Sequence, residues 1–174
     1  MKQLLGVLFF AGLSLQGLGQ SNALLEFHNK YKDYGDYFSF RIEGGLLKAL
    51  SRIETDDPEA GDFLEMISKI DAIDIHSIHV KESDFGESDF REITRKIKKE
   101  KFEDLITVVG EDKKINFLVR ESGGKITDLL LIINHPEEFT LLNISGEIDL
   151  STISKLSKCM DFKGSGDLAN LDKE

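Results

Sequence analysis

The stretch KINFLVRESGGKITDLLLIINHPEEFTLLNISG, residues 114–146, decides the fold of this chain. It contains three largely apolar runs separated by short turn clusters. The first run alternates apolar with polar residues, which is typical of a strand with one wet face. The second, residues 126–133, is apolar at nearly every position and predicts a central strand covered on both faces. Gly123 and Gly124 between them favour a tight hairpin. We therefore expect an antiparallel meander here.

Helical patterns fill much of the first half of the chain. Apolar residues recur at helical spacing over residues 22–33, 46–53 and 60–70. Asp57 followed by Pro58 is a typical start for the third of these helices. Its apolar stripe, which we expect to be buried, comprises Ala60, Phe63, Leu64, Ile67 and Ile70.

Two strands and a further helix are predicted around these stretches. Residues 37–42 are rich in aromatic residues and predict a strand at a sheet edge, which Gly44 ends. Residues 72–80 also predict a strand, in which a change of apolar parity near Ser77 indicates a bulge. Ser88 can cap the helix that follows.

These elements assemble into one α+β domain over residues 20–161. We expect a mostly antiparallel sheet of five or six strands, with a C-terminal β-meander and helices packed on one face. The 174 residues include 40% hydrophobic residues, enough for a single core. Asp149 or Ser151 can cap a closing helix with the stripe Ile153, Leu156, Ser157 and Met160. Residues 162–174 turn to Gly, Ser, Asp and Lys and are expected to form a disordered tail.

The N-terminus has the pattern of an export signal. Lys2 precedes an apolar run, and the small residues that follow predict a signal peptide over residues 1–19, cleaved between Gly19 and Gln20. The alternative is a retained anchor or core helix. Cleavage would leave no membrane span and place the protein in the periplasm or outside the cell. The only cysteine, Cys159, is not the first mature residue, so we expect no lipid anchor and no intramolecular disulfide.

Charge and motifs exclude several function classes. The chain has 32 acidic and 22 basic residues, a formal charge of −10, which disfavours nucleic acid as a partner. The sequence contains no nucleophile elbow, phosphate-binding glycine loop or calcium loop. His76 and His79 are three residues apart on a predicted strand, which directs them to opposite faces rather than to one metal ion. We therefore expect no catalytic residues, metal or cofactor, and no enzyme activity.

One local cluster departs from the acidic balance. The predicted helix that ends near residue 101 carries a basic face formed by Arg95, Lys96, Lys98, Lys99 and Lys101. Such a face can dock an acidic partner or phospholipid head groups. The alternative is a solvated helix face whose cations favour the helix C-terminus.

The order of segments resembles a known family. The residues that carry the resemblance are Phe102–Val108, Phe117–Glu121, Gly123–Ile126, Asp128–Leu131, Gly146–Leu150 and Ile153–Leu156. Together they are similar to the domain of unknown function numbered 4252, found in small exported proteins of Bacteroidetes-type Gram-negative bacteria. The resemblance implies no catalytic residues. It also implies an envelope setting, a lipoprotein cysteine in many members that this chain lacks, and a link to sigma and anti-sigma genes.

Three functional hypotheses follow. The first is a non-enzymatic binding or interaction module of the cell envelope, with an envelope protein as its partner. The second is a small exported hydrolase whose site is assembled from dispersed residues, with His76 or His79 as the residue to test. The third is an accessory of an envelope-stress sigma and anti-sigma system.

Overall fold

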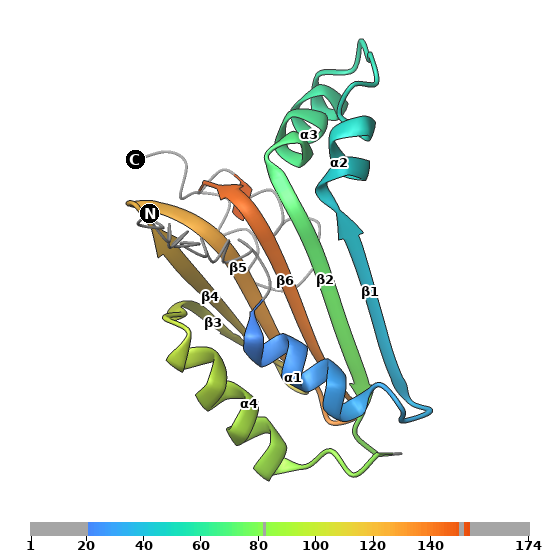
Figure 1. The fold of residues 1–174 in the computed structure, drawn as a ribbon, viewed down its shortest axis with the longest axis vertical. Coiled ribbons are helices and arrows are strands. Elements are labelled where there is room, and N and C mark those ends of the chain that lie inside the picture. Colours follow the sequence, from blue (N-terminus) through green and yellow to red (C-terminus); the bar gives the residue numbers. More distant parts are fainter. Residues whose placement is uncertain (1–20, 82, 150–151, 154–174) are drawn as a thin grey trace, which may run out of the picture.

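A six-stranded antiparallel sheet forms the centre of the molecule. The computed structural model describes residues 21–81, 83–149 and 152–153. The strand order is β1-β2-β6-β5-β4-β3, and every neighbouring pair is antiparallel (Figure 1). This confirms the predicted fold class, and β3 to β6 form the expected meander. The strands are β1 (Tyr37–Glu43), β2 (Ile70–His79), β3 (Glu103–Val109), β4 (Lys114–Ser122), β5 (Lys125–Asn134) and β6 (Glu138–Ile148).

Four helices surround the sheet within the described residues. They are α1 (Asn22–Tyr31), α2 (Gly44–Leu50), α3 (Pro58–Ser68) and α4 (Glu87–Lys99). In Figure 1, α1 and α4 lie side by side across one half of the same face of the sheet. The expectation that the helices pack on one face holds only for these two, because α2 and α3 contribute Leu47, Met66 and Ile67 to the opposite face. α2 and α3 pack against each other and project beyond the end of β1 and β2.

The apolar residues of the sheet form two clusters, one on each face. On the face that α1 and α4 cover, hereafter the helix face, Leu24, Ile93 and Ile97 pack with strand residues such as Leu130 and Phe139. On the opposite face, α2 and α3 contribute Leu47, Met66 and Ile67 to a cluster with strand residues that include Ile115, Phe117, Leu129, Leu131 and Ile144. The central position of β5 explains its continuous apolar run, because each face of this strand contacts one of the two clusters.

Local turn chemistry behaves as the sequence indicates at three places. Gly123 and Gly124 connect β4 to β5 with φ angles of 62° and 77°, which side chains disfavour. Asp57 caps α3 by accepting a hydrogen bond from the Glu59 N–H at 2.9 Å. Asp149 accepts a hydrogen bond from the Thr152 N–H at 2.7 Å, which starts the predicted closing helix.

Four local expectations are wrong. The parity change in β2 does not reflect a bulge near Ser77, because its pairing with β6 shifts between Ile70 and Ala72 instead. The helix expected over residues 46–53 instead spans Gly44–Leu50, although the strand before it ends ahead of Gly44 as predicted. α4 has Gly86 rather than Ser88 as its N-cap, and Asp89 accepts the Gly86 N–H. The fourth is Phe63, which is 51% exposed instead of buried.

Several predictions concern residues outside the described ranges. These are the signal peptide with its cleavage site at Gly19 and Gln20, the closing helix beyond Ile153, Cys159 and the tail at 162–174. No helix among the described residues is long and apolar enough to cross a membrane.

Candidate functional site

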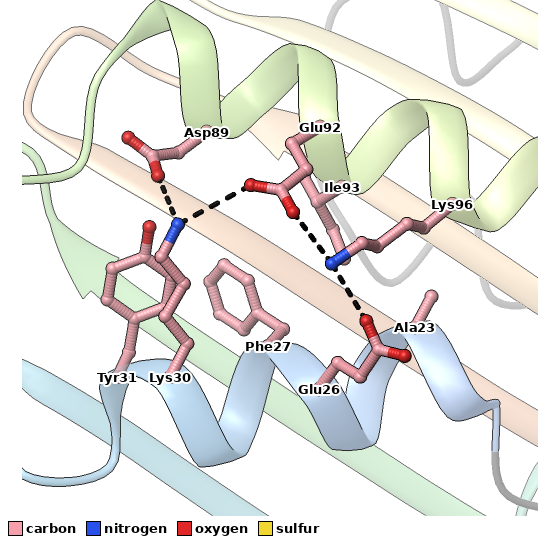
Figure 2. A pocket seen from close by; sticks show the side chains of 9 residues that line it. All are labelled: Ala23, Glu26, Phe27, Lys30, Tyr31, Asp89, Glu92, Ile93 and Lys96. Carbon is pink, nitrogen blue, oxygen red and sulfur yellow. Dashed lines mark hydrogen bonds and ion pairs between the residues drawn. The ribbon is translucent and has the colours of Figure 1, made fainter.

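The interface between α1 and α4 consists of a row of ion pairs that lies over apolar side chains. Figure 2 shows Lys30 of α1 between Asp89 and Glu92 of α4, and Lys96 of α4 between Glu92 and Glu26 of α1. The Nζ atom of Lys96 lies 2.7 Å from a carboxylate oxygen of each partner. Each cation is therefore shared between carboxylates, and together these ion pairs join the two helices.

Burial and hydrogen bonding act in opposite directions on Asp89 in this interface. Burial alone would raise the pKa of its carboxyl group, but hydrogen bonds from Lys30 and from the Gly86 N–H lower that pKa to about 2. The pKa of Lys30 is raised, chiefly by its hydrogen bond to Asp89. Only a small cavity of about 20 Å³ remains between the helices. This interface, hereafter the α1–α4 seam, therefore has a structural role.

The predicted basic face is divided by the fold. Lys96 is directed into the ion pairs of the α1–α4 seam, and Lys98 lies 2.8 Å from Asp104 of β3. Arg95, Lys99 and Lys101 are exposed, and no ion pair joins them to an acidic residue in the described part of the chain. The structure thus reduces the continuous basic face to three open cations.

Two histidines meet around one tyrosine on the helix face. The Tyr37 hydroxyl lies 2.6 Å from Nδ1 of His76 and 2.9 Å from Nδ1 of His28. Because a hydroxyl carries one proton, it donates to one imidazole and accepts from the other. Burial lowers the pKa of His76 to about 4, which keeps its ring neutral, and raises the pKa of Tyr37 to about 12. His79 is exposed and belongs to the other strand parity, as predicted.

Three further polar side chains, Asp74, Asp128 and Asn143, are buried on the helix face. Arg41 Nη1 contacts both carboxylate oxygens of Asp74 at 2.6 and 2.7 Å, and Arg120 Nε lies 2.9 Å from Asp128. Asn143, opposite Asp74 in the strand register, is 1% exposed and has no hydrogen-bond partner among the residues that the structure describes. No group of acidic, cysteine and histidine side chains in the described ranges could hold a metal ion.

An open apolar surface lies on the projecting helices α2 and α3 and on the segment between them (Figure 1). Four large apolar side chains there are between 41% and 57% exposed: Leu46, Leu50, Ile53 and Phe63. Their neighbours Leu47 and Ile67 point into the core instead. Exposed apolar side chains that gather on adjacent elements are typical of interaction sites, whereas single ones are common on any surface. We call these four residues the α2–α3 surface and take it as the candidate functional site.

The comparison with protein families identifies the chain. A family model described as "Domain of unknown function (DUF4252)" matches residues 31–156. The chain belongs to this family. No curated protein and no solved structure matches it. The resemblance seen in the sequence is confirmed, and the family description carries no activity to transfer.

The match defines which part of this DUF4252 chain is common to the family model. It begins at Tyr31, the last residue of α1, and covers the whole sheet with α2, α3 and α4. The α2–α3 surface therefore lies inside the family domain, whereas most of α1 lies before it. α1 is nevertheless joined to the domain by the ion pairs of Figure 2.

Sequence reasoning placed Phe63 in a buried stripe and did not identify the α2–α3 surface, although two signals could have indicated it. α2 is only seven residues long. A two-turn helix at the end of a sheet buries only the side that meets the sheet, so the helical spacing of Leu46, Leu47 and Leu50 does not require all three to be covered. The nearby acidic residues Glu54, Asp56 and Glu59 are a second sign of a solvated tip.

Proposed function

We propose that this DUF4252 protein is an exported, non-enzymatic interaction module of the cell envelope. Its contact surface is the α2–α3 surface, and its partner is an envelope protein. Export rests on the N-terminal signal pattern with cleavage between Gly19 and Gln20. The observation that carries the binding role is that α2, α3 and the segment between them, which project from the sheet, expose four large apolar side chains (Figure 1).

The charges around this surface indicate the chemistry of the partner. The segment between α2 and α3 and the first turn of α3 carry exposed carboxylates at Glu54, Asp56, Asp57 and Glu59, against one basic residue, Arg52. An apolar centre with a charged rim is the usual arrangement of a protein interface. The matching surface on the partner is therefore apolar with a basic rim, and increasing salt should slow their association.

The non-enzymatic part of the proposal is supported by the positions of the histidines. His76 is 5% exposed and its Nδ1 is bonded to Tyr37, while His79 lies on the other strand parity. The two therefore do not meet at one reacting atom. A panel of hydrolase substrates tests this: turnover that is lost in His76→Ala would contradict the non-enzymatic assignment.

Site-specific photocrosslinking in the producing cells tests the binding surface. A benzophenone amino acid at position 63 should give a crosslinked product of defined mass, identified by mass spectrometry as an envelope protein. The matched control is the same amino acid at position 109, because Val109 is 74% exposed on β3, at the other edge of the sheet. A product of equal yield from both positions, or from neither, would contradict the proposal.

Substitution gives a second test with a quantitative outcome. The double variant Leu46→Ser with Phe63→Ser should lose the crosslink from a probe at position 53, since truncating an apolar anchor typically costs more than about 2 kcal/mol of binding. Val109→Ser should leave it unchanged. Both variants should fold, because the replaced side chains are exposed.

Export itself is tested by N-terminal sequencing of the secreted chain, which should begin at Gln20.

A further inference from the structure

The two edges of the sheet differ in how well they are protected against pairing. β3, one edge strand, has a register shift between Asp104 and Ile106 and begins with the charged residues Glu103 and Asp104. Bulges and charges are the usual devices that prevent edge-to-edge association. β1, the other edge, pairs with β2 in a continuous register from Tyr37 to Glu43 and contains neither lysine nor proline. Its two charged residues, Arg41 and Glu43, form an ion pair with each other. β1 is therefore the less protected edge.

The hydrogen-bond pattern shows which backbone groups β1 leaves free. The His79 N–H donates to the Asp36 carbonyl, so Asp36 and His79 form a hydrogen-bonded pair. In an antiparallel ladder such pairs alternate with non-hydrogen-bonded ones. The N–H and C=O groups of residues 38, 40 and 42 consequently bond to β2. Those of Ser39 and Arg41, with the Tyr37 C=O and the Glu43 N–H, point away from the sheet. The Tyr37 N–H donates instead to the Tyr34 carbonyl, and the Glu43 carbonyl belongs to the N-cap of α2. The groups that point away offer a regular row of donors and acceptors to another strand.

We propose that β1 pairs antiparallel with β1 of a second copy of this chain, with Phe40 on the two-fold axis. This register is the one in which all seven residues of both strands overlap. It pairs Ser39 with Arg41 of the second copy, which gives two pairs with two hydrogen bonds each, and Tyr37 with Glu43, which gives two pairs with one hydrogen bond each, so about six hydrogen bonds form. The axis passes through a non-hydrogen-bonded pair, Phe40 with its own copy.

Side-chain chemistry favours this register and a second copy as the occupant. On the face opposite α1 and α4, Phe38 would meet Ile42 of the second copy, and the two Phe40 rings would meet each other. Phe38 and Phe40 are 57% and 50% exposed in the single chain, and pairing would cover both. On the helix face, no like charges are opposed, because Arg41 faces Ser39. A shift by one pairing step in one direction would place Arg41 directly opposite its own copy, which is destabilising, and a shift in the other direction would leave only residues 37–41 overlapping.

This inference does not rest on the α2–α3 surface, because it concerns the free edge and the aromatic side chains of β1. A dimer of this kind doubles the sheet and leaves β3 as the edge at each end. It also gives each assembly two copies of the α2–α3 surface, which raises its avidity for a partner that has two sites.

A cysteine placed on the proposed axis tests both the dimer and its register. In a background with Cys159→Ser, Phe40→Cys should form a disulfide-linked dimer on mild oxidation, because Cα atoms of a non-hydrogen-bonded pair lie about 4.5 Å apart and suit a disulfide. The matched control Phe38→Cys lies on the same face of the same strand, but opposite Ile42 of the second copy. It should not crosslink. Equal crosslinking of both variants would overturn the register and the proposal with it.

Sedimentation of the unmodified protein gives an independent test. The purified protein should sediment as a dimer at near-physiological ionic strength, and Phe40→Lys should sediment as a folded monomer, because two like charges would then be directly opposed. Val109→Lys, at the other edge, should remain a dimer, and circular dichroism verifies that both variants fold. A protein that is monomeric at every concentration, or a Phe40→Lys variant that remains dimeric, would overturn the proposal.

Discussion

The hydroxyl of Tyr37 lies 2.6 Å from Nδ1 of His76, and burial lowers the pKa of that histidine from 6.5 to about 4. Asp74, on the same face, opposes the shift but does not reverse it. Between pH 6.5 and pH 4 the unfolded chain binds a proton that the folded chain excludes. The free energy of unfolding should therefore fall as the pH drops through this window, by about 3 kcal/mol at most.

Urea unfolding at a series of pH values checks this expectation with a matched pair of variants. His76→Gln should remove most of the pH dependence between pH 6.5 and pH 4, because no imidazole is left to exclude a proton. His79→Gln should retain it, because His79 is exposed. An unchanged slope in His76→Gln would mean that another group excludes the proton.

The Lys30–Asp89 pair gives a second pH dependence in a lower window. The pKa of Asp89 is about 2 in the folded chain against 3.8 in the unfolded one, so its contribution is present above pH 3.8 and is lost as the pH falls towards 2. Asp89→Asn should lower the free energy of unfolding at pH 7 by about 2 kcal/mol and change it little at pH 2. Thermal unfolding at the two pH values measures the difference.

An exposed carboxylate of the same helix is the control for that experiment. Glu87 pairs with Arg91 one turn away, and both side chains are largely exposed. Glu87→Gln should therefore change the free energy of unfolding by less than about 0.5 kcal/mol. If Glu87→Gln and Asp89→Asn cost the same, Asp89 does not join α1 to α4.

The parts of the fold that sequence predicted are those that local patterns specify. Leu129, Leu130 and Leu131 are consecutive and all buried, as expected for a strand covered on both faces, and the sequence shows that run directly. The prediction that Phe63 is buried is wrong because helical spacing indicates which residues share one side of a helix, but not whether another element covers that side. The α2–α3 surface was missed for this reason.

Features that depend on distant residues were not predictable. The bulge in β2 lies where Ile70 pairs with Gly146 of β6. The alternation of apolar and polar residues within β2 does not show which residue of another strand pairs with it. Lys96 pairs with Glu26, which lies far from it in the sequence, so a basic run on one helix could not reveal that this lysine joins α4 to α1. The sequence alone therefore predicts a continuous basic face on this helix.

Two adjacent glycines in α2 provide a test of close packing. A Cβ atom on Gly44 would lie 2.6 Å from the Asp71 carbonyl oxygen, whereas one on Gly45 would meet nothing within 4 Å. Gly45→Ala should stabilise the protein by about 0.5–1 kcal/mol, because alanine is the better helix former. Gly44→Ala should destabilise it, since backbone atoms must move. Chemical unfolding of the two variants should give shifts of opposite sign, and equal shifts would contradict the close approach of α2 to β2.

Asn143 offers a test of the buried polar residues on the helix face. Its side chain is 1% exposed, its amide has no partner among the described residues, and Leu130 lies opposite it on β5. Burying an unsatisfied amide is costly, so Asn143→Leu, which is similar in size, should raise the free energy of unfolding by about 1 kcal/mol. Asn143→Asp should lower it, because a further carboxylate would lie opposite Asp74. Urea unfolding at pH 7 distinguishes the outcomes, and a loss of stability in Asn143→Leu would show that the amide is hydrogen-bonded in solution.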